Sequence, residues 1–154
     1  MTESHVRIGE MAEQLGVSTR TLRYYEEIGL LQPAAYSKGG TRRYSEDDRA
    51  RILRIRELQA IMGFNLEEIR EILHADDRLA ELRTEYHSSA SRKRQAAIVI
   101  EASKLNARTQ EQVLAKIAVL QAFQSELEAK ATRHHEVAEE LGIDLDAELR
   151  ASAG

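Results

Sequence analysis

The sequence contains no cysteine, a single proline and no long hydrophobic run. Without cysteine, these 154 residues cannot form disulfide bonds, thiolate metal sites, iron–sulfur clusters or a cysteine nucleophile. No apolar stretch approaches the roughly 18 residues that a membrane-spanning helix needs. Residues 1–5 also lack the basic and apolar regions of a secretory signal. We therefore expect a cytoplasmic protein that does not bind membranes.

Glycine and proline are unevenly distributed along the chain. Six of the eight glycines and the only proline, Pro33, lie in the first 63 residues, whereas 64–141 contains neither. Because both residue types disfavour helix interiors, we expect short elements joined by turns first and mostly helix afterwards. The expected organisation is a domain over 1–75, a helical region over 76–141 and a flexible acidic tail over 142–154.

The formal net charge of −4 conceals a basic segment. Residues 38–56 have a local net charge of +4. The basic side chains in it are Lys38, Arg42, Arg43, Arg49, Arg51, Arg54 and Arg56. An acidic chain can still bind a polyanion if its cations share one face. A solvated helix face explains the same charges equally well, so charge alone leaves nucleic-acid binding open.

The first 27 residues predict two short helices. Apolar residues at helical spacing predict the first helix over 8–15. They are Ile8, Met11, Ala12 and Leu15. Gly16 then stands where helices commonly end in a left-handed residue. Ser18 is a suitable N-cap for a second helix that extends to residue 26 or 27. In that helix Leu22 and Tyr25 face inward, and Arg20, Arg23 and Tyr24 lie outward or on the flank.

The spacing Ala12-x3-Gly16-x5-Leu22 is typical of a helix-turn-helix. The small alanine lets the helices approach closely, the glycine accommodates the turn, and the leucine fills the shared core. A plain helical hairpin with a glycine turn is the alternative.

A short hairpin and two further capped helices follow. Gly39 and Gly40 form the tip of a hairpin within 31–44, whose return strand is cationic and aromatic. Ser45 and Asp48 have the spacing of a capping box that opens a third helix, and Gly63 ends it. Residues 65–68 repeat the capping pattern for a fourth. The apolar positions of these two helices are Ile52, Leu53, Ile55, Leu58, Ile61 and Met62, then Ile69, Ile72 and Leu73.

These segments together resemble the MerR family of transcription regulators. The matching runs are residues 7–12 for the first helix, 21–26 and 28–31 for the recognition helix and its exit, 40–45 for the wing and 62–69 for the second helix pair. The resemblance covers about residues 6–73. Thr41 departs from it, because the family usually has an aromatic residue there, so we expect the contact of the wing tip to differ.

The resemblance implies a mainly α fold, with a winged helix-turn-helix DNA-binding domain followed by a long coiled-coil dimerisation helix. It also implies a homodimer joined by an antiparallel helix pair on a palindromic promoter operator. Such regulators often bend and untwist promoter DNA, and RNA polymerase acts on the same promoter.

The resemblance also implies which residues contact DNA. On the recognition helix and its start they are Ser18, Thr19, Arg20, Arg23 and Tyr24. Arg42 and Tyr44 match wing residues that touch the DNA backbone, and Arg43 lies beside them without a clear family match. The chemistry agrees, since arginine can read guanine edges or grip phosphate. Tyrosine hydroxyls and helix N-terminal amides can position phosphates.

The second half of the chain predicts a dimerisation helix. We expect a loop at 74–77, a short amphipathic helix over 79–87, a break at 88–91 and then one helix to Leu141. Along that helix one seam has alternating steps of four and three residues, the pattern of a coiled coil. It consists of Val113, Ile117, Leu120, Gln124, Leu127, Ala131, His134, Ala138 and Leu141, and Phe123 widens it. We expect homodimerisation through Val113, Ile117, Leu120, Phe123, Leu127 and Ala131. An intramolecular bundle with residues 79–87 is the alternative.

The sequence says little about an effector. His134 and His135 point about 100° apart on a helix, so they are a poor ligand pair, and we expect no metal and no cofactor. A small-molecule site is left open, with Tyr86, His87, Arg92 and Arg94 as candidate residues and ordinary surface as the alternative. A nucleophile elbow, a phosphate-binding loop and a His-Glu-x-x-His motif are all missing, so we expect no enzyme. Two other hypotheses are an architectural or excision-accessory DNA-binding protein without an effector, and an adaptor that binds another protein through its C-terminal helices.

Overall fold

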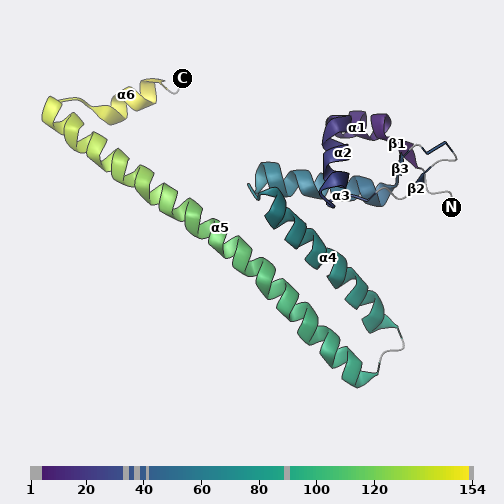
Figure 1. Cartoon of the computed structure of the whole chain (residues 1–154). Helices are drawn as coiled ribbons and strands as arrows, with labels where there is room; N and C mark the ends of the chain where they lie inside the picture. Colours follow the sequence, from purple (N-terminus) through teal and green to yellow (C-terminus); the bar gives the residue numbers. More distant parts are fainter. Residues whose placement is uncertain (1–4, 33–34, 37–38, 41, 89–90, 153–154) are drawn as a thin grey trace. The chain divides into compact units, whose positions relative to one another are not determined.

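The computed structural model of the chain describes residues 5–32, 35–36, 39–40, 42–88 and 91–152 (Figure 1). The chain forms two compact units, Met1–Asn106 and Ala107–Gly154. The first contains short helices around a small sheet and then a helical hairpin. In the second, the regular structure of the described residues is helical.

The two expected N-terminal helices are confirmed. Helix α1 spans Ile8–Leu15 and helix α2 spans Thr19–Glu27. Gly16 between them has φ 61°, a left-handed conformation that glycine adopts without a Cβ penalty. The Ser18 Oγ accepts a hydrogen bond of 3.0 Å from the Thr21 amide, which is the predicted N-cap.

A three-stranded antiparallel sheet contains the predicted hairpin and one more strand. Strands β2 (Ala35–Tyr36) and β3 (Arg42–Tyr44) form the hairpin, and β1 (Val6–Arg7) pairs with the other edge of β3. Val6 lies opposite Tyr44, and Arg7 lies opposite Arg43. The sequence does not reveal β1, because two residues are too few to show an alternating pattern.

Helix α3 spans Glu46–Arg56 and opens with the predicted capping box of Ser45 and Asp48. It continues into a π-helical segment, η1 (Glu57–Ile61), where the Met62 amide donates to the Glu57 carbonyl. The sequence does not predict this wider turn. It changes the helical register, and Ile61 and Met62, two of the apolar positions named from the sequence, are exposed. Leu53, another of these apolar positions, is exposed as well.

Helix α4 runs without a break over Leu66–His87, so the loop predicted at 74–77 is wrong. Within this segment the Asp77 carboxylate pairs with Arg51 of α3 at 2.7 Å. Asn65 and Glu68 form the capping box that the sequence predicts.

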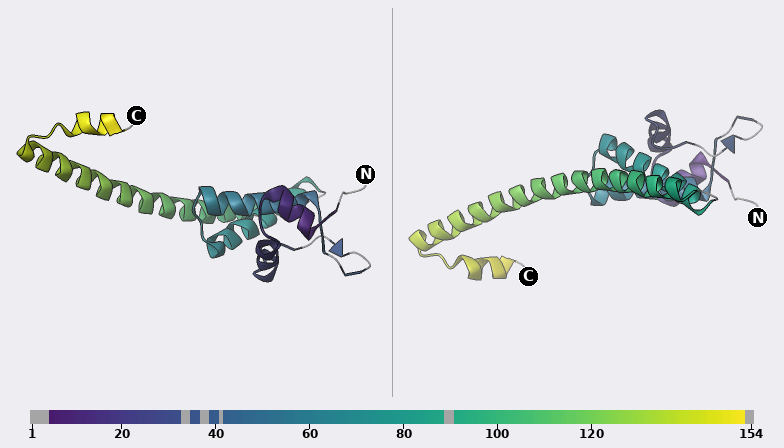
Figure 2. Two further views of the ribbon diagram at one scale, coloured as in Figure 1. Left: turned by 90° about the horizontal axis from the view of Figure 1, so that it is seen from above. Right: turned by 90° about the horizontal axis from the view of Figure 1, so that it is seen from below.

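One core joins the sheet, α1 to α3, η1 and the first half of α4. Its buried residues are Met11, Ala12, Leu15, Leu22, Tyr25, Leu30, Leu31, Tyr44, Ile52, Ile55, Leu58, Phe64, Ile69, Ile72 and Leu73. The views in Figure 2 show that α2 and β2 lie on the same side of α1. The core contains Leu22 and Tyr25 of α2 and Tyr44 of β3.

The single long helix predicted after residue 91 is confirmed as α5 (Arg92–Leu141). Its first turns run antiparallel to α4 (Figure 1) and bury Ile98, as α4 buries Leu82. Through this hairpin the first compact unit extends to Asn106, beyond the boundary expected at residue 75.

The second unit contains the rest of α5 and a short helix, α6 (Leu145–Ser152). The segment expected to be a flexible tail therefore contains a helix. Asp144 caps it, because its carboxylate accepts a bond of 3.0 Å from the Ala147 amide. In the part of the chain that the structure describes, no helix is both long and apolar enough to cross a membrane.

Candidate nucleic-acid interface

The exposed face of α2 carries two arginines and a tyrosine. Arg20, Arg23 and Tyr24 lie on one side of the helix, and Tyr24 is 46% exposed. The guanidinium groups of Arg20 and Arg23 make no hydrogen bond or ion pair with any other described residue. Thr19 and Ser18 at the start of the helix are exposed too. The face therefore presents hydrogen-bond donors that the fold does not use.

The opposite face of α2 fixes this helix on the core. Leu22 is fully buried beside Tyr25, whose hydroxyl donates to the Gln59 Oε1 at 3.3 Å. Burial raises the pKa of the Tyr25 hydroxyl, so it stays protonated at neutral pH. At the end of α1, the Arg56 guanidinium donates to the Leu15 carbonyl. These contacts fix the turn between the two helices.

The three predicted wing residues differ in their surroundings. The backbone of Arg42 pairs with Tyr36, but its side chain lies outside the described part of the structure. The half-buried Arg43 donates from Nη1 to the His5 carbonyl at 3.4 Å. Tyr44 is 0% exposed, and its hydroxyl donates to the Glu26 carboxylate of α2. Tyr44 therefore connects the sheet with α2 from inside, rather than offering a surface for direct contact.

The arginines of α3 are occupied within the protein. Arg49 pairs with Glu46 at 3.0 Å, and Arg54 pairs with Glu57 at 2.8 Å. Arg51 bridges the Leu30 carbonyl, at 2.6 Å, and the Asp77 carboxylate. With Arg56 held at Leu15, these four cations stabilise the domain. The basic segment 38–56 is therefore not one cationic face, and Lys38 lies outside the described residues.

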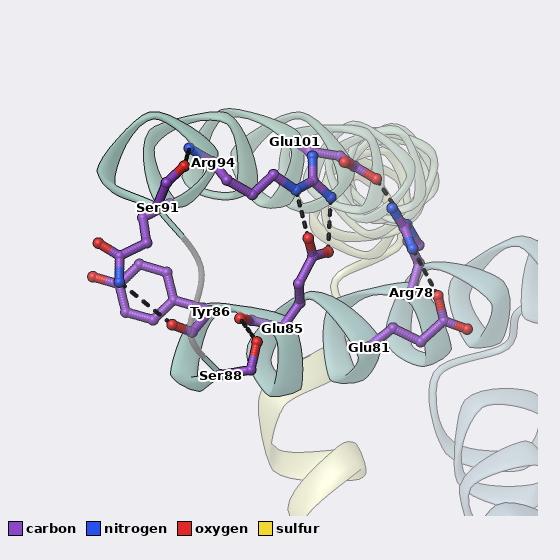
Figure 3. Close-up of polar contacts among 9 residues, drawn as sticks. Arg78, Glu81, Glu85, Tyr86, Ser88, Ser91, Arg94 and Glu101 are labelled. Carbon is purple, nitrogen blue, oxygen red and sulfur yellow. Dashed lines mark hydrogen bonds and ion pairs between the residues drawn. The ribbon is translucent and has the colours of Figure 1, made fainter.

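The candidate effector residues lie where α4 turns into α5 (Figure 3). Arg94 donates from Nε and Nη2 to the two carboxylate oxygens of Glu85, at 2.5 and 2.7 Å. These bonds lower the pKa of Glu85. Tyr86 and His87 pack edge to face with ring centroids 5.3 Å apart, and Arg92 is exposed. An effector anion at Arg94 would have to displace a carboxylate.

The predicted dimerisation seam is exposed in the single chain. Val113, Ile117, Leu120, Phe123 and Leu127 are large apolar side chains, each at least 40% exposed. Ala131 is exposed as well, whereas Ala138 further along the seam is only 6% exposed. Among the described residues, no three histidine, aspartate or glutamate side chains are grouped closely enough to hold a metal ion.

Sequence reasoning missed one cation beside the wing. Arg7 of β1 is exposed and lies directly opposite Arg43. Its role depends on a strand pairing with a residue 36 positions away, which no local pattern reveals. The alternating pattern of a longer strand would have been the only signal.

The fold and this surface define a winged helix-turn-helix domain, with α2 as the exposed second helix and the sheet as the wing. Residues 6–76 match the model of the MerR HTH family regulatory protein. This segment, just under half of the chain, is a MerR-family helix-turn-helix domain.

Similar proteins include a transcriptional regulator and a nodulation protein. The HTH-type transcriptional regulator YfmP of Bacillus subtilis is 34% identical over 74 residues, which are 48% of this chain and 53% of YfmP. The nodulation protein NolA of Bradyrhizobium diazoefficiens is 42% identical over 76 residues, 49% of this chain and 32% of NolA. The match thus spans about half or less of these relatives.

A solved structure shares the fold over most of the chain. HiNmlR, a MerR family regulator lacking the sensor domain and bound to promoter DNA, aligns with 91% of this chain and 97% of its own, at a TM-score of 0.53 and 24% identity.

Proposed function

We propose that this protein is a transcriptional regulator of the MerR type that binds a palindromic promoter operator as a homodimer and distorts the DNA. The observation that supports it most is the exposed face of α2, where Arg20 and Arg23 have no partner in the described part of the fold. Arginine forks of this kind suit guanine edges and phosphates. The relatives that match this segment include an HTH-type transcriptional regulator and a mercuric resistance operon regulatory protein.

The homodimer is supported by the seam of α5. Ile117, Leu120 and Leu127 follow a coiled-coil spacing and are exposed in the single chain. A second copy would cover these side chains. Two α2 helices could then read half-sites about 34 Å apart on one side of a duplex.

DNA selection from a random pool tests the proposal. We expect the selected sequences to contain an inverted repeat. Arg20→Ala should relax the preference at one position of each half-site and cost about 1–3 kcal/mol of binding free energy. Arg83→Ala is the matched control, because Arg83 is an exposed arginine of α4 whose loss changes the net charge equally.

Three outcomes would contradict parts of this function. A selection that yields no shared sequence would support an architectural DNA-binding protein instead. Equal preferences for the Arg20→Ala variant and the wild type would remove α2 from base recognition. Unbent operator DNA in a circular-permutation gel assay would exclude distortion by the protein alone.

A further inference from the structure

Tyr44 lies at the base of the wing, where the sheet meets the core. It is the last residue of β3, and its side chain is fully buried. The next residue, Ser45, caps α3 and accepts a hydrogen bond from the Asp48 amide. From this point β3 leads back to Arg42, which pairs with β2. Because Tyr44 joins the wing to the rest of the domain, its orientation sets that of the wing.

The contact between the wing and α2 depends on side chains. Among the described elements, β3 packs beside α1 and α3, and its backbone approaches α2 less closely. The Tyr44 hydroxyl spans this distance, since it donates a hydrogen bond to Oε1 of Glu26 in the last turn of α2. A hydrogen bond to a carboxylate is shorter and stronger than one between neutral groups. The sheet is therefore linked to α2 by a strong and directional contact.

The helix at the other end of this contact is itself held in place. Tyr25, next to Glu26, is buried, and its hydroxyl donates to Oε1 of Gln59 at 3.3 Å. The exposed Arg20 and Arg23 lie on the same helix. The hydrogen bond from the sheet therefore sets the orientation of the wing relative to the helix that carries these two arginines.

We propose that the Tyr44–Glu26 hydrogen bond positions the wing relative to α2 so that both elements bind the same DNA molecule. The inference rests on the proposed function, because a MerR-type regulator meets DNA with both α2 and the wing. Tyr44 and Glu26 are positioning residues, since they act through the orientation of the wing and not by touching DNA.

The expected effect on DNA binding follows from preorganisation. A surface built from two elements binds more tightly when these are already held in the bound orientation. Without the hydrogen bond, the free protein spends part of its time with the wing in other orientations. The apparent dissociation constant then rises in inverse proportion to the fraction of molecules that are ready to bind.

Measuring operator affinity tests this positioning role. Tyr44→Phe removes the hydroxyl and keeps the ring. We expect the dissociation constant for the selected operator to rise about tenfold, the lower end of what a hydrogen bond to a charged group contributes. The base preferences should stay those of the wild type, since the arginines of α2 are unchanged. A dissociation constant equal to that of the wild type would overturn the positioning role while DNA binding stands.

Variants of Glu26 show whether this pair is responsible. Glu26→Gln retains an oxygen that accepts the hydrogen bond, whereas Glu26→Ala has none. The two variants have the same charge, so Glu26→Ala should bind the operator about tenfold more weakly than Glu26→Gln. This comparison also decides the matter if Tyr44→Phe does not fold. Adding Tyr44→Phe to Glu26→Ala should change the dissociation constant by less than about twofold, because the bond is already lost. Equal affinities of the two Glu26 variants would overturn the proposal.

A stability control separates positioning from a structural role. Ile72→Val is the matched control, because it removes one methylene from a buried side chain of α4 and lowers the melting temperature of the free protein. It should leave the operator dissociation constant unchanged. In the free protein, Tyr44→Phe should speed amide hydrogen exchange in β3 more than Ile72→Val does.

Two further results would be decisive. An equal loss of operator affinity in Ile72→Val would reduce the effect of Tyr44→Phe to lost stability and overturn the positioning role. If the wild type selected no duplex DNA, the proposed function itself would fail, and this role with it.

Discussion

At the scale of single residues, one residue type serves two purposes in this domain. Arg51 and Arg56 tie loops and helix ends together through carbonyl oxygens, whereas Arg20 and Arg23 point outward. The sequence predicts the outward pair correctly from helical spacing within α2. The sequence cannot show that Arg51 and Arg56 bind within the domain instead of forming a cationic surface, because their partners lie 21 and 41 residues away.

The same limit applies to Tyr44. Its place in a cationic strand suggests a surface contact, but strand alternation directs it to the core, and its partner Glu26 is 18 residues earlier. Helix N-caps are different, because the groups that form their hydrogen bonds lie within four residues of one another in the sequence. The caps at Ser18, Ser45 and Asn65 could all be predicted from sequence for this reason.

Two glycines give a residue-scale test of backbone conformation. Gly16 has φ 61°, whereas Gly9 lies inside α1 without a positive φ. Gly16→Ala should lower the free energy of unfolding by about 1–2 kcal/mol, because a Cβ is disfavoured in left-handed backbone. Gly9→Ala should raise it by about 0.5–1 kcal/mol, because its added Cβ meets open space in a helix. Urea unfolding of the two variants measures both effects, and equal changes would contradict the assigned turn.

At the scale of elements, the sequence predicts where helices lie better than it predicts whether they are continuous. The bounds of α1, the start of α3 and the single helix α5 follow from apolar spacing, caps and missing glycine. A loop is predicted at 74–77, yet α4 continues through this segment, where Asp77 pairs with Arg51 of α3. The π turn of η1 has no local signal, and it exposes Ile61 to 79%.

Helix α6 is linked to α5 by a contact that depends on protonation. The His135 Nδ1 lies 3.0 Å from the Ala131 carbonyl, and its Nε2 lies 3.3 Å from the Asp146 carboxylate. Both partners can only accept hydrogen bonds, so both ring nitrogens must carry a proton. These bonds, with the nearby Glu139 charge, raise the pKa of His135.

The link should therefore weaken as pH rises. Since the folded-state pKa lies above the ordinary value of about 6.5, the link is fully formed below that pH and is lost as pH passes the raised pKa. An NMR titration of the His135 ring should show this pKa, and Asp146→Asn should lower it toward the ordinary value. His134→Gln is the matched control and should leave it unchanged. An identical titration in the Asp146→Asn variant would rule out the link.

At the scale of the whole molecule, the MerR resemblance seen in the motifs is confirmed over residues 6–76. The first compact unit extends further, to Asn106, beyond the end of the family match at residue 76. Side-chain pairs across the α4–α5 hairpin explain the difference. Arg94 meets Glu85, and Arg78 meets Glu101 at 2.7 Å, pairings between helices that periodicity along one helix cannot predict.

The homodimer can be tested by charging its seam. Leu120→Glu combined with Leu127→Glu places two carboxylates on the proposed interface, where burial of unpaired charge is costly. We expect a monomer in analytical ultracentrifugation and a loss of specific DNA binding at the same time. Ala122→Glu with Ala129→Glu is the matched control, because these positions have the same spacing on the opposite side of α5 and should leave a dimer. A seam variant that is monomeric and still binds the operator with normal affinity would show that specific DNA binding does not require the homodimer.

The long stretch of α5 beyond Asn106 has a thermodynamic consequence. From 107 to 141 only Ala138 is buried, so a chain on its own gains little from removing apolar surface from water there. A helix gains most of its stability from tertiary packing. If a second copy covers the seam, as proposed, mass action governs how much of this half stays helical, and dilution of the protein lowers its helix content.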